Sequence, residues 1–253
     1  MFTRVKTPTE IESMRTSGKM LACILQLIDK TVVPGMTGKD VSELVVKELK
    51  AFGAKASFLG YAGFPAVICI SVNDEVVHGI PSAAQFKEGD VVGFDFGVTY
   101  NEMITDSAFT LIVGGKDTQN SDVIRLVEKT EQSLYAGLDK VKNGVRVGDI
   151  ASAIQRVLDR EKLGIVRELV GHGVGHEVHE DPNIPNYGTA GTGSVLKTGM
   201  TVAIEPMATL GKHQITVDED GWTIRTKDNS ISAHFEHTVL IADKGCEILT
   251  AWQ

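Results

Sequence analysis

Apolar residues recur at every third or fourth position in four stretches of the chain, which is the spacing of amphipathic helices. In the first stretch, Thr9 is the expected N-cap, Glu10 and Glu12 lie in the first turn, and Pro34-Gly35 ends the helix. Further turn signals, such as Asn143-Gly144, separate the later stretches. Helices are predicted over residues 9–33, 39–52, 121–141 and 147–163.

A different pattern, short runs of β-branched and aromatic residues, predicts strands after each pair of helices. Because helices and neighbouring strands come in separate blocks, the pattern favours an α+β fold with an antiparallel sheet over a doubly wound fold. Strands are predicted over residues 67–72, 91–98, 103–113, 202–205, 214–217 and 237–241.

The second half of the chain repeats features of the first in the same order. Residues 35–42 resemble 144–151 at an offset of 109, and 87–95 resemble 197–205 at an offset of 110. A shorter match relates Val76-Val-His78 to Glu177-Val-His179 at an offset of 101. Each match alone is weak, but together they favour an internal duplication. We therefore expect one domain over 1–253, built from two pseudo-symmetric halves of about 1–118 and 119–253 that meet at a shared sheet.

Composition narrows the class of protein. The 253 residues are 42% hydrophobic, which is enough to bury a core, and the net charge of −8 argues against a broad nucleic-acid surface. The cysteines Cys23, Cys69 and Cys246 form no C-x-x-C pair, which suggests a reducing compartment. The first 20 residues lack the apolar stretch of a signal peptide, and no apolar run approaches a membrane span. We expect a soluble cytoplasmic protein.

The repeat aligns acid with acid and imidazole with imidazole: Asp95 with Glu205, and His78 with His179. Each acid lies in an apolar strand-like run. One such acid is usually a strand-end surface residue, but two at matched positions favour buried charges that are paired or bind metal. Asp106 follows Asp95 by eleven residues across a predicted turn, so a hairpin would bring both carboxylates to one side.

Two further segments carry candidate residues. Glu236 lies in a strand-like segment, where the alternative is an exposed position. His172 is flanked by glycines, which argues against a helix and hence against an H-E-x-x-H zinc site. Its alternative is a loop histidine bonded to backbone, and His176 is expected at the surface or beside the site. Cys69 follows apolar residues and is expected to be a buried core thiol rather than a nucleophile.

Four carboxylates with one imidazole form an oxygen-rich donor set that suits Mn²⁺, Fe²⁺ or Co²⁺ better than a structural zinc site. Their charge of about −4 suits two divalent ions, which together generate hydroxide near neutral pH and polarise the carbonyl that it attacks. His78 and His179 would then hydrogen-bond the substrate carbonyl or amide. The sequence contains no G-x-x-x-x-G-K-[ST] loop and no G-x-S-x-G elbow.

Residues 69–81, 171–175, 199–207 and 232–238 closely resemble the type I methionine aminopeptidases, and the resemblance extends from Ile11 to Thr250. The length resembles the short bacterial form. The resemblance implies a pita-bread α+β fold with helices on the outer face of a pseudo-twofold antiparallel sheet. It also implies hydrolytic removal of the initiator methionine from nascent proteins, favoured where the second residue is small. The implied partners are nascent chains and, transiently, the ribosome, with no DNA or membrane, for a monomeric enzyme.

The same resemblance assigns roles to individual residues. Asp106 and Glu236 would bridge two divalent ions (Co, Mn, Fe(II), Zn or Ni), and Glu205 would also transfer a proton to the leaving amine. His179 would bind the scissile carbonyl, and His78 the amide beside it. The full implied metal-ligand set is Asp95, Asp106, His172, Glu205 and Glu236, and the implied methionine-pocket set is Tyr61, Phe64, Cys69 and Trp222.

The chain departs from the family pattern at a few positions. The family usually has Arg at His176, an aromatic residue at Val178, Gln at His234 and Gly at Thr105. Val178 and His234 would shape the side-chain pocket. The alternatives are a prolidase-like or aminopeptidase P-like enzyme, which acts beside proline, and a metal-free binding module that keeps the fold. The complete ligand set argues against the second.

Overall fold

The computed structural model describes residues 5–252. Four helices and fifteen strands lie in this range. The helices are α1 (Pro8–Thr31), α2 (Gly38–Phe52), α3 (Ser121–Leu138) and α4 (Val147–Arg160), with two short 3₁₀ turns, η1 (Tyr61–Gly63) and η2 (Lys116–Thr118). The strands are β1 (Lys55–Ala56), β2 (Cys69–Val72), β3 (Glu75–Val77), β4 (Val91–Tyr100), β5 (Met103–Ile112), β6 (Gly164–Ile165), β7 (Gly171–Gly173), β8 (Glu180–Ile184), β9 (Thr201–Ile204), β10 (Met207–Thr209), β11 (Ile215–Val217), β12 (Ile224–Thr226), β13 (Ser232–His234), β14 (Glu236–Ala242) and β15 (Gly245–Ile248).

The N-cap of the first helix lies two residues earlier than expected. Thr7, not Thr9, is the N-cap: its hydroxyl accepts from the Glu10 backbone N–H, and the Glu10 carboxylate accepts from the Thr7 N–H at 2.7 Å. This capping box needs its acid three residues after the cap, and Pro8 fits the first helical position because it has no N–H to satisfy. The prediction of Thr9 as cap was therefore wrong, whereas the four helices themselves are confirmed.

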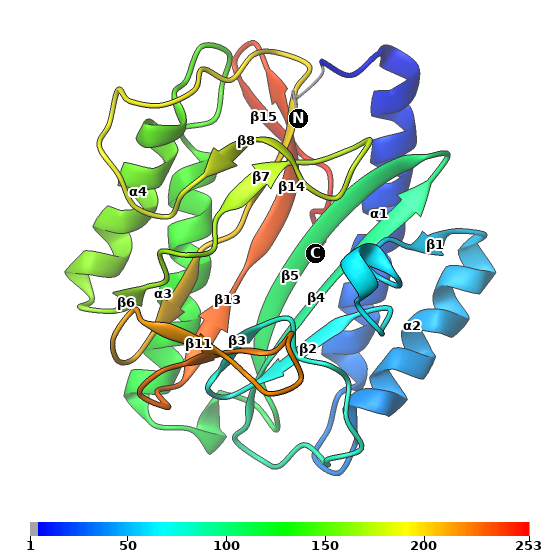
Figure 1. Cartoon of the computed structure of the whole chain (residues 1–253), viewed down its shortest axis with the longest axis vertical. Helices are drawn as coiled ribbons and strands as arrows, with labels where there is room; N and C mark the ends of the chain where they lie inside the picture. The colour runs from blue at the N-terminus through cyan, green and yellow to red at the C-terminus, as the bar shows by residue number, and fades with distance from the viewer. Residues whose placement is uncertain (1–4, 253) are drawn as a thin grey trace.

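Among the described residues, a nine-stranded sheet forms the centre of the molecule, and its strand pairs are all antiparallel. The order along its main path is β1-β4-β5-β14-β9-β7-β8. The β4–β5 hairpin crosses the middle as two long strands, with α1 and α2 on one side and α3 and α4 on the other (Figure 1). Each half of the sequence thus supplies one helix pair and one side of the sheet.

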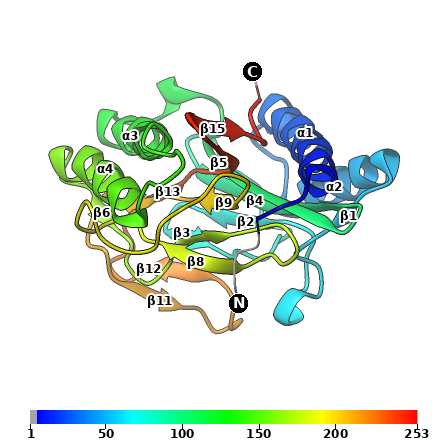
Figure 2. The same ribbon diagram turned by 90° about the horizontal axis from the view of Figure 1, so that it is seen from above.

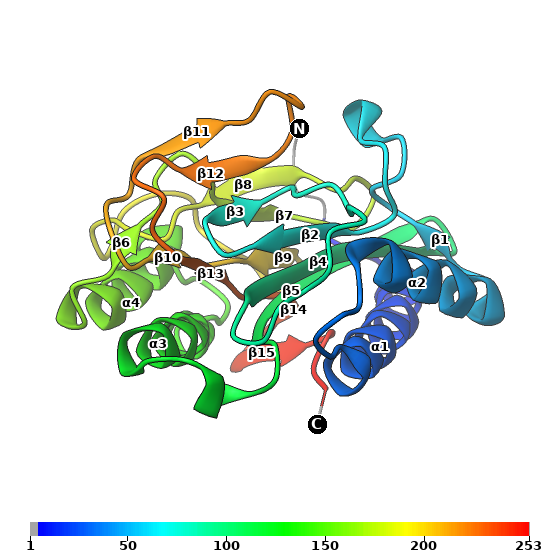
Figure 3. The ribbon, with the colours of Figure 1, turned by 90° about the horizontal axis from the view of Figure 1, so that it is seen from below.

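The helices cover one face of this sheet, and β11 and β12 lie over the other (Figures 2 and 3). Side chains alternate along a strand, so Phe94 and Phe96 of β4 enter the helix-facing core while Asp95 between them faces the opposite side. We call this second side the inner face. Burying each large core side chain contributes about 1.5–3 kcal/mol, which holds the helices against the sheet.

Among residues 5–252, no helix combines the length and apolar character that crossing a membrane requires.

Candidate metal centre

The five predicted ligands converge on the inner face because the strand registers align them. Asp106 of β5 lies opposite Gly97, two residues along β4 from Asp95, as the predicted hairpin requires. On the other side of β5, Glu236 pairs with Ala108. His172 of β7 lies opposite Ala203, near the end of the strand that Glu205 follows.

The ligand atoms are close enough to share a cation. One ligand atom each from Asp106, His172 and Glu236 lie within 4.8 Å of one another. Glu205 adds an oxygen 3.4 Å from the His172 Nε2, and Asp95 lines the same cavity as the other four residues. The structure therefore brings all five predicted residues together.

The electrostatics of this cluster fit a divalent cation. Burial is the first cause that raises the pKa of each of the four carboxyls, and neighbouring carboxylates add to it for Asp95, Glu205 and Glu236. For Asp106 the pKa rises from its ordinary 3.8 to about 7. Within residues 5–252, one buried oxygen each of Asp95, Asp106 and Glu236 has no hydrogen-bond partner. Buried carboxylates in this state are costly unless a cation or proton compensates them.

The protonation of His172 supports the same conclusion. Its Nδ1 lies 2.9 Å from the Gly173 carbonyl oxygen, which can only accept, so Nδ1 carries the hydrogen. Burial lowers the pKa of His172 to about 3, so the ring is neutral and Nε2 keeps its lone pair. That lone pair lies beside the Glu205 carboxylate, an unfavourable arrangement that a bound cation would make favourable.

A cavity of about 160 Å³ opens beside the carboxylates and is lined by both predicted substrate-binding histidines, His78 and His179. Burial, and secondarily His179, lowers the pKa of His78 to about 4, and burial lowers the pKa of His179. Both rings are therefore neutral near pH 7, and each offers one N–H. His78 also has a φ of 61°, a backbone conformation that is unusual outside glycine and is concentrated at functional sites.

The rest of the cavity wall is apolar. The predicted members Tyr61, Phe64, Cys69 and Trp222 all line it, and the rings of Phe64 and Trp222 meet edge to face at 5.2 Å. Cys69 is buried, as predicted, and burial raises the pKa of its thiol. An apolar wall ending at carboxylates and imidazoles suits an apolar side chain next to a peptide bond.

Several residues of the wall were not found from the sequence, although each lies within three residues of a predicted site residue. These are Phe58, Val77, Leu169 and Val170. Val178 lines the cavity as expected. His234, also expected to shape the pocket, does not line the cavity but is buried beside two of the ligands, with its Nε2 3.8 Å from Glu205 and 4.0 Å from Glu236. His234 lies two residues before Glu236 in the sequence, which places it near the ligands.

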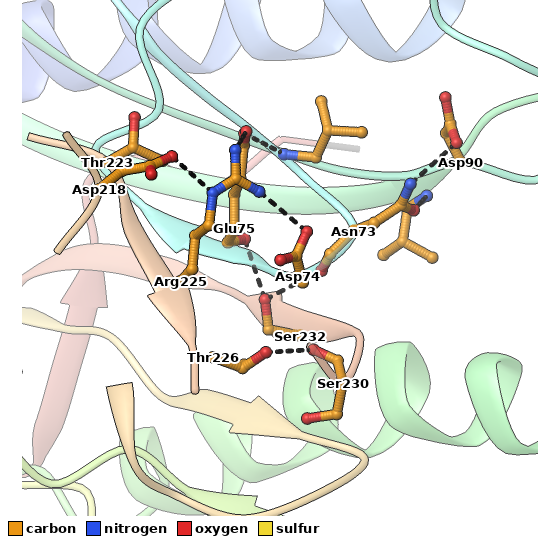
Figure 4. Close-up of polar contacts among 12 residues, drawn as sticks. Asn73, Asp74, Glu75, Asp90, Asp218, Thr223, Arg225, Thr226, Ser230 and Ser232 are labelled. Carbon is orange, nitrogen blue, oxygen red and sulfur yellow. Dashed lines mark hydrogen bonds and ion pairs between the residues drawn. The ribbon is translucent and has the colours of Figure 1, made fainter. Parts of the chain in front are cut away.

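Arg225 of β12 fixes the hairpin that carries Trp222 over the cavity. Its guanidinium donates to Asp74 at 3.0 Å, to Glu75 at 2.7 Å and to Asp218 at 2.7 Å (Figure 4). Because Asp74 and Glu75 precede His78 in the chain, this network ties the Trp222 side of the cavity to the His78 side.

The loop that carries His179 is anchored by a buried ion pair. The Lys6 ammonium donates to Glu180 at 2.6 Å, with side-chain exposures of 0% and 4%. Glu180 also accepts from the His176 backbone N–H, and the His176 ring contacts Glu10 at 2.8 Å. His176 is half-buried and links the loop to α1.

Comparison with known proteins identifies relatives over nearly the whole chain. The profile of Metallopeptidase family M24 matches residues 12–243. Methionine aminopeptidase 1 of Bacillus subtilis is 43% identical over 245 residues, covering 97% of this chain and 98% of that protein. The crystal structure of methionine aminopeptidase from Thermotoga maritima superposes with a TM-score of 0.96 at 46% identity, covering 99% of this chain and 100% of that one. Prolidase from Pyrococcus furiosus has a TM-score of 0.80 at 24% identity over 99% of this chain and 66% of its own, which shows the shared fold alone.

Proposed function

The chain belongs to Metallopeptidase family M24, and we propose that it removes the N-terminal methionine from newly made proteins by metal-dependent hydrolysis. The pita-bread fold expected from the resemblance is confirmed by these relatives. One observation carries the proposal: a cavity whose wall is mostly apolar is also lined by a cluster of buried, uncompensated carboxylates. Such a cavity positions an apolar N-terminal side chain so that its peptide bond lies at the metal ligands.

Two divalent ions fit the donor set, because four carboxylates carry a charge of about −4. Co, Mn, Fe(II), Zn and Ni all accept oxygen and imidazole ligands. Asp106 and Glu236, together with Asp95, His172 and Glu205, would hold these ions. When bound, such ions lower the pKa of water and polarise the carbonyl under attack.

The remaining steps belong to side chains of the cavity. The N–H of His179 donates to the scissile carbonyl oxygen and stabilises the negative charge that develops there. His78 holds the neighbouring amide. Glu205, whose pKa is raised by burial and by Asp106, accepts a proton and returns it to the leaving amine. The rings of Phe64 and Trp222 hold the methionine side chain and exclude water.

We further propose a single domain over 1–253 with halves of about 1–118 and 119–253, because both halves contribute to one sheet. We also propose that the chain acts as a monomer in the cytoplasm, on nascent chains emerging from the ribosome. The preference for a small second residue follows from the resemblance, and peptide assays test it directly.

The decisive experiment compares peptides that differ in the first two residues. The purified chain with Mn²⁺ is expected to release methionine from Met-Ala-Ser rapidly, from Met-Lys-Ser slowly, and to leave Xaa-Pro peptides intact. Glu236→Gln is expected to abolish cleavage, whereas Asp117→Asn, which removes an exposed carboxylate outside the cavity, should not. Preferred cleavage beside proline would favour the prolidase alternative, and intact Met-Ala-Ser would refute the proposal.

A further inference from the structure

Tyr61 makes a polar contact that its role as a pocket wall does not require. Its hydroxyl lies 2.8 Å from Nδ1 of His179, and the two ring centroids are 5.4 Å apart at an interplanar angle of 52°. The two residues are separated by 118 positions in the sequence, so the fold itself creates this pair.

The backbone fixes the position of the tyrosine. The turn around η1 is closed by hydrogen bonds from Gly60 to the Phe64 carbonyl at 2.9 Å, from Tyr61 to Phe58 at 3.0 Å and from Phe64 to Tyr61 at 2.9 Å. Gly60 has a φ of 82°, a conformation that glycine adopts without strain. The hydroxyl is thus presented to His179 by a tied turn rather than by a free loop.

We propose that Tyr61 is a positioning residue that holds His179 in the tautomer with hydrogen on Nε2, by donating its hydroxyl proton to Nδ1. This inference rests on the proposed function, in which His179 donates to the scissile carbonyl. A neutral imidazole has one N–H, and a carbonyl oxygen only accepts, so the nitrogen that faces substrate must carry the hydrogen. With Nδ1 occupied by Tyr61, that nitrogen is Nε2.

The environment of Tyr61 also favours donation from its hydroxyl to His179. Burial, with the nearby Glu177, raises the pKa of the Tyr61 hydroxyl, so it keeps a proton to donate. Tyr61 is 38% exposed, so water competes for its hydroxyl, and its effect should be moderate.

The test reads the tautomer directly. In the full chain labelled with ¹⁵N-histidine at pH 8, both metal-free and with Zn²⁺, multiple-bond ¹H–¹⁵N spectra distinguish protonated from bare ring nitrogens, and His179→Gln assigns the signal. We expect protonated Nε2 in the wild-type chain, and a rise of about 3–10-fold in the ratio of the Nδ1–H to the Nε2–H tautomer in Tyr61→Phe.

Kinetics separate this role from the pocket wall. Tyr61→Phe keeps the ring, so kcat on Met-Ala-Ser should fall about 3–10-fold with KM changed less than about twofold. Tyr61→Leu also removes the ring and should raise KM as well. Tyr187→Phe, which removes a hydroxyl outside the cavity, should change neither the spectrum nor the kinetics.

Two results would overturn the inference: a wild-type His179 protonated on Nδ1, or a Tyr61→Phe chain whose spectrum and kcat match the wild type. Failure of the wild-type chain to cleave Met-Ala-Ser with any metal would instead overturn the proposed function, because the ring spectra do not depend on cleavage.

Discussion

Replacing Asp106 with Asn should stabilise the metal-free protein while removing its response to metal. The pKa of Asp106 is about 7 in the folded chain because burial disfavours its charge, against about 3.9 in the unfolded chain. The folded state therefore binds the proton more tightly. The contribution of Asp106 to the stability of the metal-free protein is therefore most favourable below about pH 4, falls as the pH rises from 4 to 7, and carries the full cost of the buried charge above about pH 7.

The size of the effect follows from the difference between the folded and unfolded pKa of Asp106. At about 1.4 kcal/mol per tenfold change in proton affinity, it sets an upper bound of about 4 kcal/mol at pH 8. Because Asp95 shares the proton, we assign about half, or about 2 kcal/mol, to Asp106. The neutral Asn side chain avoids this cost, which corresponds to a rise in Tm of roughly 4–8 °C for a chain of this size.

The assay is thermal unfolding of EDTA-treated wild type and Asp106→Asn at pH 5 and pH 8, with and without Mn²⁺. The stabilising effect should be large at pH 8 and small at pH 5. Mn²⁺ at about 100 times its Kd should stabilise the wild type by about 2.7 kcal/mol and the variant far less. The exposed Asp117→Asn serves as control. A variant less stable than wild type at pH 8 without metal would refute the reasoning.

Three further predictions concern other parts of the molecule. Lys6→Met should lower the free energy of unfolding in urea by about 3–5 kcal/mol, because it leaves Glu180 buried without its cation. Adding Glu180→Gln to this variant should restore more than half of the lost stability, and additive losses from the two substitutions would contradict this reasoning. His179→Gln should lower kcat on Met-Ala-Ser about 100-fold with unchanged circular dichroism, and an equal loss confined to KM would exclude its role at the carbonyl. Gly18→Ala should cost about 1–3 kcal/mol in urea unfolding, because a Cβ there would lie 2.3 Å from the Leu249 carbonyl oxygen; an unchanged midpoint would show that the helix shifts freely.

Local patterns in the sequence predicted most of the fold. The helices appeared because their apolar spacing is long and regular, and the ends differ from prediction by a few residues. The error at Thr9 arose because two threonines precede the same acidic turn, and only the geometry selects Thr7, which places Glu10 three residues after the cap. Short strands such as β6 and β13 escaped prediction because two or three residues carry no detectable period.

In the candidate site, too, residues related by local patterns could be predicted from the sequence, and residues related by distant contacts could not. Asp95 and Asp106 could be paired from the sequence because a hairpin relates them locally. Residues that act through distant contacts could not be found in this way. The Lys6–Glu180 pair joins positions 174 residues apart, and nothing near Lys6 in the sequence marks it for burial. The contact between Tyr61 and His179 is of the same kind, since its two residues are 118 positions apart in the sequence.

The central claim is that methionine removal depends on cations held by the buried carboxylates. The most direct measurement is the rate of methionine release from Met-Ala-Ser by the wild-type chain after exhaustive chelation and then during titration with Mn²⁺. The account predicts no release from the chelated protein and recovery as Mn²⁺ is added, with no recovery in Glu236→Gln. Release that persists in the chelated protein, or recovery in the variant equal to wild type, would contradict it.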